Sequence, residues 1–227
     1  MIDETKNKIK EMLEEVIAEF IRDFLKSPFD FTHERDIHGQ FYHRILSHKN
    51  NFLLNIPYQP YPLLHLEYPH DTASTSKRAR GRLDLVILKP DKTSKLSNDS
   101  GDYNKRLKKM FALEFEFNDT GQKAVDHFDN DAKKLAGCEG ASTYLFIFMR
   151  DKTFSNNSAK NKPIYFEKLI KKEEPFNAEK FPDKIYYVNA QPKIKPSQTK
   201  KAAFEHVEII TQDTKEIEIL GKKSKDY

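Results

Sequence analysis

Two short apolar segments of the chain carry carboxylates where a sheet interior would normally hold apolar side chains. Asp84 interrupts the apolar run 82–88, and Glu114 and Glu116 alternate with large apolar residues in 111–117. Side chains two residues apart on a strand point to the same face, so Glu114 and Glu116 would lie side by side. A carboxylate in a sheet interior is costly unless a cation or hydrogen-bond donors compensate it. If the two segments pair as neighbouring strands, three carboxylates converge, and we expect a divalent cation to relieve their repulsion.

Each of these carboxylates also has an interpretation that involves no chemistry. The apolar residues of 111–117 could form the core face alone, which would leave Glu114 and Glu116 in solvent. Asp84 could be held by backbone N–H groups or by the nearby Arg80 or Arg82. Both alternatives remain open at the level of sequence.

The amino-terminal quarter of the chain has the apolar spacing of two helices. Apolar residues recur at steps of three and four over 9–24, which predicts one long helix that ends at Ser27-Pro28. A second helix is expected after Thr32, with acidic Glu34 in its first turn. Its inward stripe would consist of Ile37, Phe41 and Ile45.

The middle of the chain has the patterns of strands and one further helix. Short apolar or alternating runs predict strands at 63–68, 82–88, 111–118 and 144–149, of which 82–88 is expected to be central. Helical spacing returns over 120–136, while the polar stretch 89–109 predicts a long loop. The order α-α-β-β-β-α-β predicts an α/β fold with a mixed central β-sheet flanked by helices. We expect one core over 1–150 and a carboxy-terminal extension over 151–227 packed on the same domain, with a short helix near 166–170 and strands at 185–188 and 207–210.

The spacing of the acidic residues resembles that of the PD-(D/E)xK, or restriction-endonuclease-like, nuclease superfamily. The family motif is an Asp on one strand and Glu-x-Lys on the next, preceded by a helix that bears an acidic residue. The resemblance covers about 34–149, with Asp84 in Gly-Arg-Leu-Asp-Leu-Val, Glu114 in Ala-Leu-Glu-Phe-Glu, and Glu34 or Asp36 on the helix. Leu83 stands where many members have Pro, and Glu116 replaces the usual Lys.

The resemblance implies a restriction-endonuclease-like core and a metal-dependent nuclease. Asp84 and Glu114, with the Phe115 carbonyl, would hold Mg²⁺, with Mn²⁺ as a substitute, and the metal would activate water. Glu34 would join through metal or water, unless it is simply a helix-dipole partner. Glu116 would act as a metal ligand or general base in place of the lysine.

The missing lysine leaves a second assignment open, because the family is reported to relocate this residue. Lys133 or Lys134 could reach in from the helix 120–136, although a lysine on a helix is usually solvated.

A group of arginines precedes the first motif and could bind a nucleic acid. Arg78, Arg80 and Arg82 lie just before Asp84 and are expected to contact phosphates, with DNA as the expected substrate. An inactive module of the same fold that binds nucleic acid or a protein partner is the alternative function. An unrelated α/β binding protein whose acidic strand faces water is a third.

The composition sets limits on other functions. A charge of +4, from 39 basic and 35 acidic residues, is too small to indicate a polyanion partner by itself. A single cysteine excludes an internal disulfide and a cysteine-rich zinc site, which favours the cytoplasm, and no apolar stretch suggests a membrane partner. The sequence is compatible with a homodimer. Four histidines recur every five residues from His33 to His48, a spacing that spreads them around a helix, so no histidine site is predicted.

Overall fold

The computed structural model describes residues 2–55, 62–70, 81–90, 107–117, 121–150, 182–190, 207–211 and 218–219. Most of the expected loop 89–109, the expected helix near 166–170, and the basic residues Arg78 and Arg80 lie outside the described residues. No helix in the described ranges combines the length and the apolarity that a membrane span requires.

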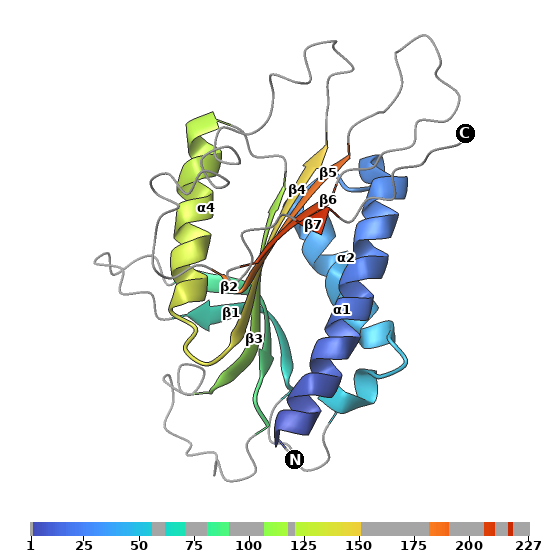
Figure 1. The fold of residues 1–227 in the computed structure, drawn as a ribbon, viewed down its shortest axis with the longest axis vertical. Coiled ribbons are helices and arrows are strands. Elements are labelled where there is room, and N and C mark those ends of the chain that lie inside the picture. Colours follow the sequence, from blue (N-terminus) through green and yellow to red (C-terminus); the bar gives the residue numbers. More distant parts are fainter. Residues whose placement is uncertain are drawn as a thin grey trace.

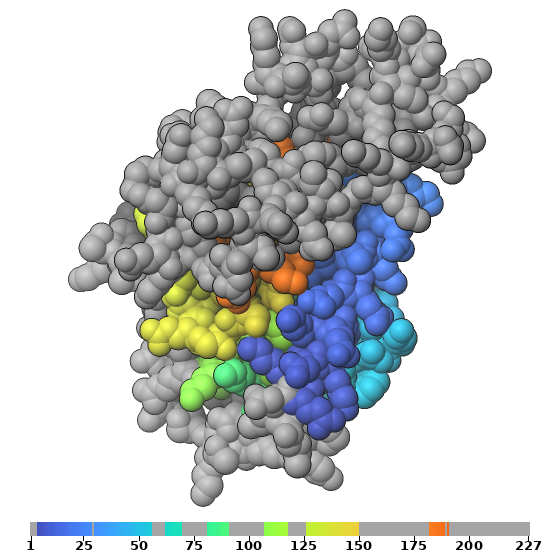
Figure 2. Space-filling model, viewed as in Figure 1, coloured from blue at the N-terminus to red at the C-terminus, as the bar shows by residue number. Residues whose placement is uncertain are grey.

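Two helices at the amino terminus form one layer of the molecule. Helix α1 (Ile2–Lys26) ends before Pro28 and is followed by the short 3₁₀ helix η1 (Pro28–Asp30). Helix α2 (Glu34–Ser47) is followed by the 3₁₀ helix η2 (Asn51–Leu54). The expected inward stripe of α2 is confirmed, since Ile37, Phe41 and Ile45 are all buried. In the space-filling view α1 forms a long surface ridge with α2 and η2 beside it (Figure 2).

Within the described residues, a mixed sheet of seven strands lies against these helices. Its strands are β1 (Leu64–His70), β2 (Gly81–Leu88), β3 (Lys109–Phe117), β4 (Ser142–Arg150), β5 (Lys184–Ala190), β6 (Val207–Thr211) and β7 (Glu218–Ile219). They are ordered in space as in the sequence. The pairs β3·β4 and β4·β5 are parallel, and the other neighbours are antiparallel. The prediction of an α/β fold with a mixed sheet between helices is confirmed at this level.

Two details of the sheet differ from the expectation. Strand β2, expected to be central, lies second from the β1 edge, and β4 occupies the middle of the order. The carboxy-terminal strands β5, β6 and β7 continue the same sheet beyond β4, so the order of elements extends past α-α-β-β-β-α-β. The sequence pattern identifies strands but not their neighbours, because pairing is decided by contacts between distant segments.

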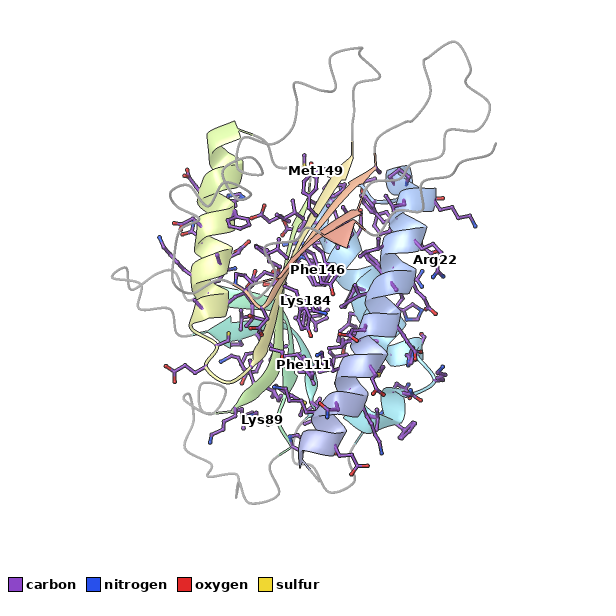
Figure 3. All side chains as sticks on the ribbon, in the orientation of Figure 1. Arg22, Lys89, Phe111, Phe146, Met149 and Lys184 are labelled. Atoms are coloured by element: carbon purple, nitrogen blue, oxygen red, sulfur yellow. The ribbon has the colours of Figure 1, made fainter. Side chains whose placement is uncertain are left out.

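Helix α4 (Gly121–Ala136) connects the parallel strands β3 and β4 and covers the other face of the sheet (Figure 1). The core between the sheet and α1 and α2 is aromatic. Phe41 packs on Phe115 at 5.1 Å between ring centroids, and Phe115 stacks on Phe146 at 5.0 Å. Figure 3 shows Phe146 on the side of the sheet that faces α1, whereas Arg22 points outward from α1. The opposite face of β3, toward α4, carries the carboxylates.

Candidate active site

Asp84 lies where strands β2 and β3 separate. Their pairing runs from Leu88 with Lys109 to Leu85 with Leu113 and is not continued beyond that pair. The backbone N–H of Phe115, two residues further along β3, instead donates to Oδ2 of Asp84 at 2.8 Å. The Asp84 carboxylate therefore accepts from a backbone N–H of β3 that has no carbonyl partner in the diverging strand β2. It also lies level with Glu114, because the antiparallel register places residues 84 and 114 opposite each other.

Glu114 and Glu116 are both buried on the α4 side of β3. Their exposed fractions are 1% and 2%, so the alternative in which these side chains are simply wetted by solvent is wrong. Phe115, between them, points to the other face and packs on Phe41. Oε1 of Glu114 is buried and accepts no hydrogen bond from the described part of the chain. Two carboxylates are thus held in a position that an apolar side chain would normally fill.

Helix α4 supplies a cation and a further carboxylate to this place. Nζ of Lys134 lies 2.7 Å from Oε2 of Glu114 and 2.6 Å from Oδ1 of Asp131, and it also donates to the carbonyl of Arg82 at 3.2 Å. Lys133 is 70% exposed and pairs with Asp129 at the helix surface. Of the two lysines that the sequence left open, the structure therefore brings Lys134 to the carboxylates and keeps Lys133 in solvent.

These groups enclose a polar cavity of about 310 Å³ between the sheet and α4. It is lined from the sheet by Asp84, Glu114, Phe115 and Glu116, from α2 by Glu34, and from α4 by His127, Asn130, Asp131 and Lys134. The four α4 residues are related by steps of three, four and seven positions, which place them on one face of the helix. Sequence reasoning identified the sheet side of this cavity and missed most of the helix side.

In the cavity, buried carboxylates outnumber the positively charged side chains. Burial raises the pKa of Asp84 from 3.8 to about 6, against the lowering effect of the Phe115 N–H. Burial, and then the charges of Asp84 and Asp131, raise the pKa of Glu114 well above its usual value. Burial also raises the pKa of Asp131. Burial lowers the pKa of Lys134, but Glu114 and Asp131 outweigh it and raise that pKa, so Lys134 remains an ammonium.

The first turns of α2 bring Glu34 and His38 to the other side of Asp84. Nε2 of His38 lies 3.5 Å from Oδ2 of Asp84 and 3.7 Å from Oε1 of Glu34. His38 is 6% exposed, and its ring packs on Phe115 at 5.4 Å between centroids. Glu34 is half exposed in the first turn of the helix, where the helix dipole also favours it. The five-residue spacing of the histidines gave no indication of this, because the groups near His38 are Glu34 of the same helix and Asp84 of β2.

The basic residues before Asp84 are described in part. Arg82 is 65% exposed and lies 3.8 Å from Oε2 of Glu67, while Arg78 and Arg80 are outside the described residues. Glu67 has a left-handed φ of 50° and interrupts the β1·β2 pairing at the level of Asp84. A strained non-glycine backbone of this kind is commonly found beside functional sites.

The donor set suits a hard divalent cation. Carboxylate oxygens are the ligands that Mg²⁺ takes from proteins, and a cation among Asp84 and Glu114 would offset the desolvation and repulsion that raise their pKa values. Searches for similar family models, curated proteins and solved structures returned no match to this chain. The chemistry of the cavity is therefore the basis for inferring a function.

Proposed function

We propose that the chain is a metal-dependent endonuclease of the PD-(D/E)xK type that hydrolyses phosphodiester bonds, with DNA as its substrate. The observation that carries this proposal is the meeting of Asp84, Glu114 and Lys134 in one cavity. An acidic residue from one strand, an acidic residue from the next and a lysine ammonium are the three groups that the motif requires. Here the lysine comes from the following helix.

Asp84 and Glu114, together with the Phe115 carbonyl, are the residues that would hold Mg²⁺, or Mn²⁺ in its place. When bound, the cation would lower the pKa of a coordinated water and stabilise the charge that develops on the phosphate. The protein supports this by fixing both ligands. The Phe115 N–H orients Asp84, and Lys134 orients Glu114.

We assign the two roles of the family lysine to two residues: Lys134 balances charge, and Glu116 accepts a proton. Because Glu114 and Asp131 keep Lys134 protonated, its ammonium is suited to balance negative charge on the phosphate and not to take a proton. Glu116 lies two residues from Glu114 on the same face of β3 and lines the same cavity. Its carboxylate is the group we assign to accept the proton of the attacking water.

Glu34 and Arg82 lie at the rim of the site. Glu34 lines the cavity from α2 and is assigned to hold the attacking water through a hydrogen bond. The exposed side chain of Arg82 is assigned to contact a phosphate next to the scissile one, with Arg78 and Arg80 as further candidates from the preceding segment. Such contacts would position the nucleic acid without reading its sequence.

Nicking of supercoiled plasmid DNA tests the proposal. Wild-type protein should convert plasmid to open circles with Mg²⁺ or Mn²⁺ and not with EDTA, and Asp84→Asn and Glu114→Gln should lose this activity. Lys133→Ala is the matched control, since its side chain faces solvent on the same helix. Activity that persists at the wild-type rate in both acidic variants would come from a contaminant and would contradict the proposal. Single-stranded DNA and RNA should be assayed in parallel to define the substrate.

A binding module without catalysis is the second candidate, and one observation favours it. Asp84 and Glu114 each already have a protein partner, in the Phe115 N–H and in Lys134, as expected of a buried structural network. Gel retardation of DNA that is never cleaved under any metal condition would favour this function over the nuclease.

A further inference from the structure

We propose that Asp131 is a positioning residue, which keeps the Lys134 ammonium in the cavity once a cation occupies the carboxylates of the sheet. This role goes beyond the proposed function and rests on it for the cation. Asp131 lies three residues before Lys134 on α4, and its carboxylate lines the same cavity as the carboxylates of β2 and β3.

The Lys134 ammonium is held from three elements. Its nitrogen lies 2.6 Å from Oδ1 of Asp131 on α4, 2.7 Å from Oε2 of Glu114 on β3 and 3.2 Å from the carbonyl oxygen of Arg82 on β2. An ammonium has three protons and accepts none, so these three oxygens match its capacity. The two carboxylate contacts are short and charged on both sides, whereas the carbonyl is neutral and further away. Asp131 and Glu114 are therefore the two strong contacts of the ammonium.

The contact with Glu114 is the one that a bound cation would weaken. Oε1 of Glu114 has no hydrogen-bond partner within the described residues, so it is available to a cation while Oε2 bonds to Lys134. A cation on this carboxylate would offset the negative charge that attracts the ammonium, and it would also repel the ammonium directly. A lysine has a flexible stem of four carbons, and Lys134 is partly exposed, so its side chain has a way out to solvent.

Asp131 can resist this loss because it is not among the ligands assigned to the cation. Its negative charge stays beside the ammonium when the charge of Glu114 is shared with a cation. The Arg82 carbonyl is then the contact that a substrate phosphate can replace, since a phosphate oxygen is charged and the carbonyl is not. Two carboxylates would thus fix the ammonium and leave one N–H for the phosphate.

The experiment follows the Lys134 ammonium by nuclear magnetic resonance of the full-length ¹⁵N-labelled protein, with Mg²⁺ as the added cation. Near neutral pH, the protons of a solvated ammonium exchange with water too fast to give a signal, whereas a buried and bonded ammonium gives one. Lys134→Arg removes this signal and so assigns it. Wild-type protein should show the signal with and without Mg²⁺. Asp131→Asn should show it without Mg²⁺, because Glu114 still holds the ammonium, and should lose it at saturating Mg²⁺.

Two further variants separate the charge of Asp131 from its mere presence. Asp129→Asn is the matched control, because it removes a carboxylate from the surface pair with Lys133 on the same helix, and it should behave as the wild type. Asp131→Glu restores the charge and should recover the signal in Mg²⁺. In plasmid assays Asp131→Asn should nick about 10–100-fold more slowly than the wild type. An unchanged nicking rate would overturn the proposal.

The spectra give further outcomes that would overturn it. These are a signal that persists in Mg²⁺-loaded Asp131→Asn, a signal already missing from this variant without Mg²⁺, and a signal missing from the Mg²⁺-loaded wild type. The wild-type result needs no variant, so the proposal stays testable if Asp131→Asn does not fold. The backbone amide of Phe115 reports in the same spectra whether Mg²⁺ binds. If it does not move in the wild type, the proposed nuclease site fails and this role fails with it. If it moves while Asp131→Asn keeps its ammonium signal, only this role is refuted.

Discussion

Replacing Asp84 with asparagine separates the metal-binding role of this carboxylate from a purely structural one. Burial raises the pKa of Asp84 from 3.8 to about 6, so the folded protein binds its proton more tightly than the unfolded chain. Stability from this group is fully present below pH 3.8 and is lost as the pH rises through about 6. At about 1.4 kcal/mol per pKa unit, the loss at neutral pH is about 3 kcal/mol.

The variant should therefore not suffer this loss. Asparagine keeps the shape and an oxygen that can accept from the Phe115 N–H, and its amide can donate to the adjacent Glu114. Without metal at pH 7.5, Asp84→Asn should be as stable as the wild type or up to about 3 kcal/mol more stable, and this advantage should vanish near pH 4. Urea denaturation followed by circular dichroism measures the difference.

Added metal should reverse the ranking. Mg²⁺ at one hundred times its dissociation constant should raise the unfolding free energy of the wild type by about 2.7 kcal/mol, and the variant should lose most of this gain. Asp129→Asn, which removes the surface pair with Lys133, is the control and should leave the metal response intact. If Asp84 is purely a structural acceptor, asparagine should instead cost about 1–3 kcal/mol with no metal effect on the wild type. That result would refute the reasoning.

Further outcomes follow from the same contacts. Lys134→Ala should abolish cleavage and, without metal, lower the unfolding free energy by about 3–5 kcal/mol, because the buried Glu114 loses its ammonium partner and must stay charged alone or take up a proton. Lys133→Ala should change cleavage and stability little, and a small effect of Lys134→Ala on both would remove Lys134 from the site. Glu116→Gln should abolish cleavage in plasmid assays while leaving Mn²⁺ binding at the other ligands within a few fold, and wild-type activity would exclude it as the base. Because burial raises the pKa of Cys138 to about 11, iodoacetamide should alkylate it at pH 8 far more slowly in the folded than in the urea-unfolded protein; equal rates would contradict its burial.

The order of helices and strands up to β4 could be predicted because each element has its own periodicity. The apolar stripe of α2 and the strict alternation around Glu114 are local patterns that burial on one face imposes. The position of β2 near the edge could not be predicted in this way. Strands that are covered on both faces have similar apolar sequences wherever they lie in a sheet.

The candidate site was predictable on the sheet and hardly at all on the helices. Asp84 and Glu114 interrupt apolar strands, so each one shows as an anomaly in its own segment. Lys134 and Asp131 do not, because charged residues are ordinary on any amphipathic helix, and neighbouring residues such as Lys133 and Lys134 differ by about 100° in direction. Only the rotation of α4 about its axis decides which lysine enters the cavity. His38 was hidden for the same reason, since its partners are not on its own helix face alone.

The location of the cavity follows from the way β3 is paired. Its amino-terminal half pairs with β2, and its parallel partner β4 accompanies it through to Phe117, so on the β2 side the ladder opens after Leu113. At that opening the Phe115 N–H has no partner in β2 and donates to the Asp84 side chain instead. The opening also lets Glu34 and His38 of α2 approach Asp84 from the other face. Helix α4 must cross the sheet to connect β3 with β4, so it passes over the same residues and brings Lys134 to Glu114. The acidic cluster, the lysine and the histidine thus converge because the antiparallel neighbour of β3 diverges from it after Leu113, whereas its parallel neighbour stays paired through Phe117.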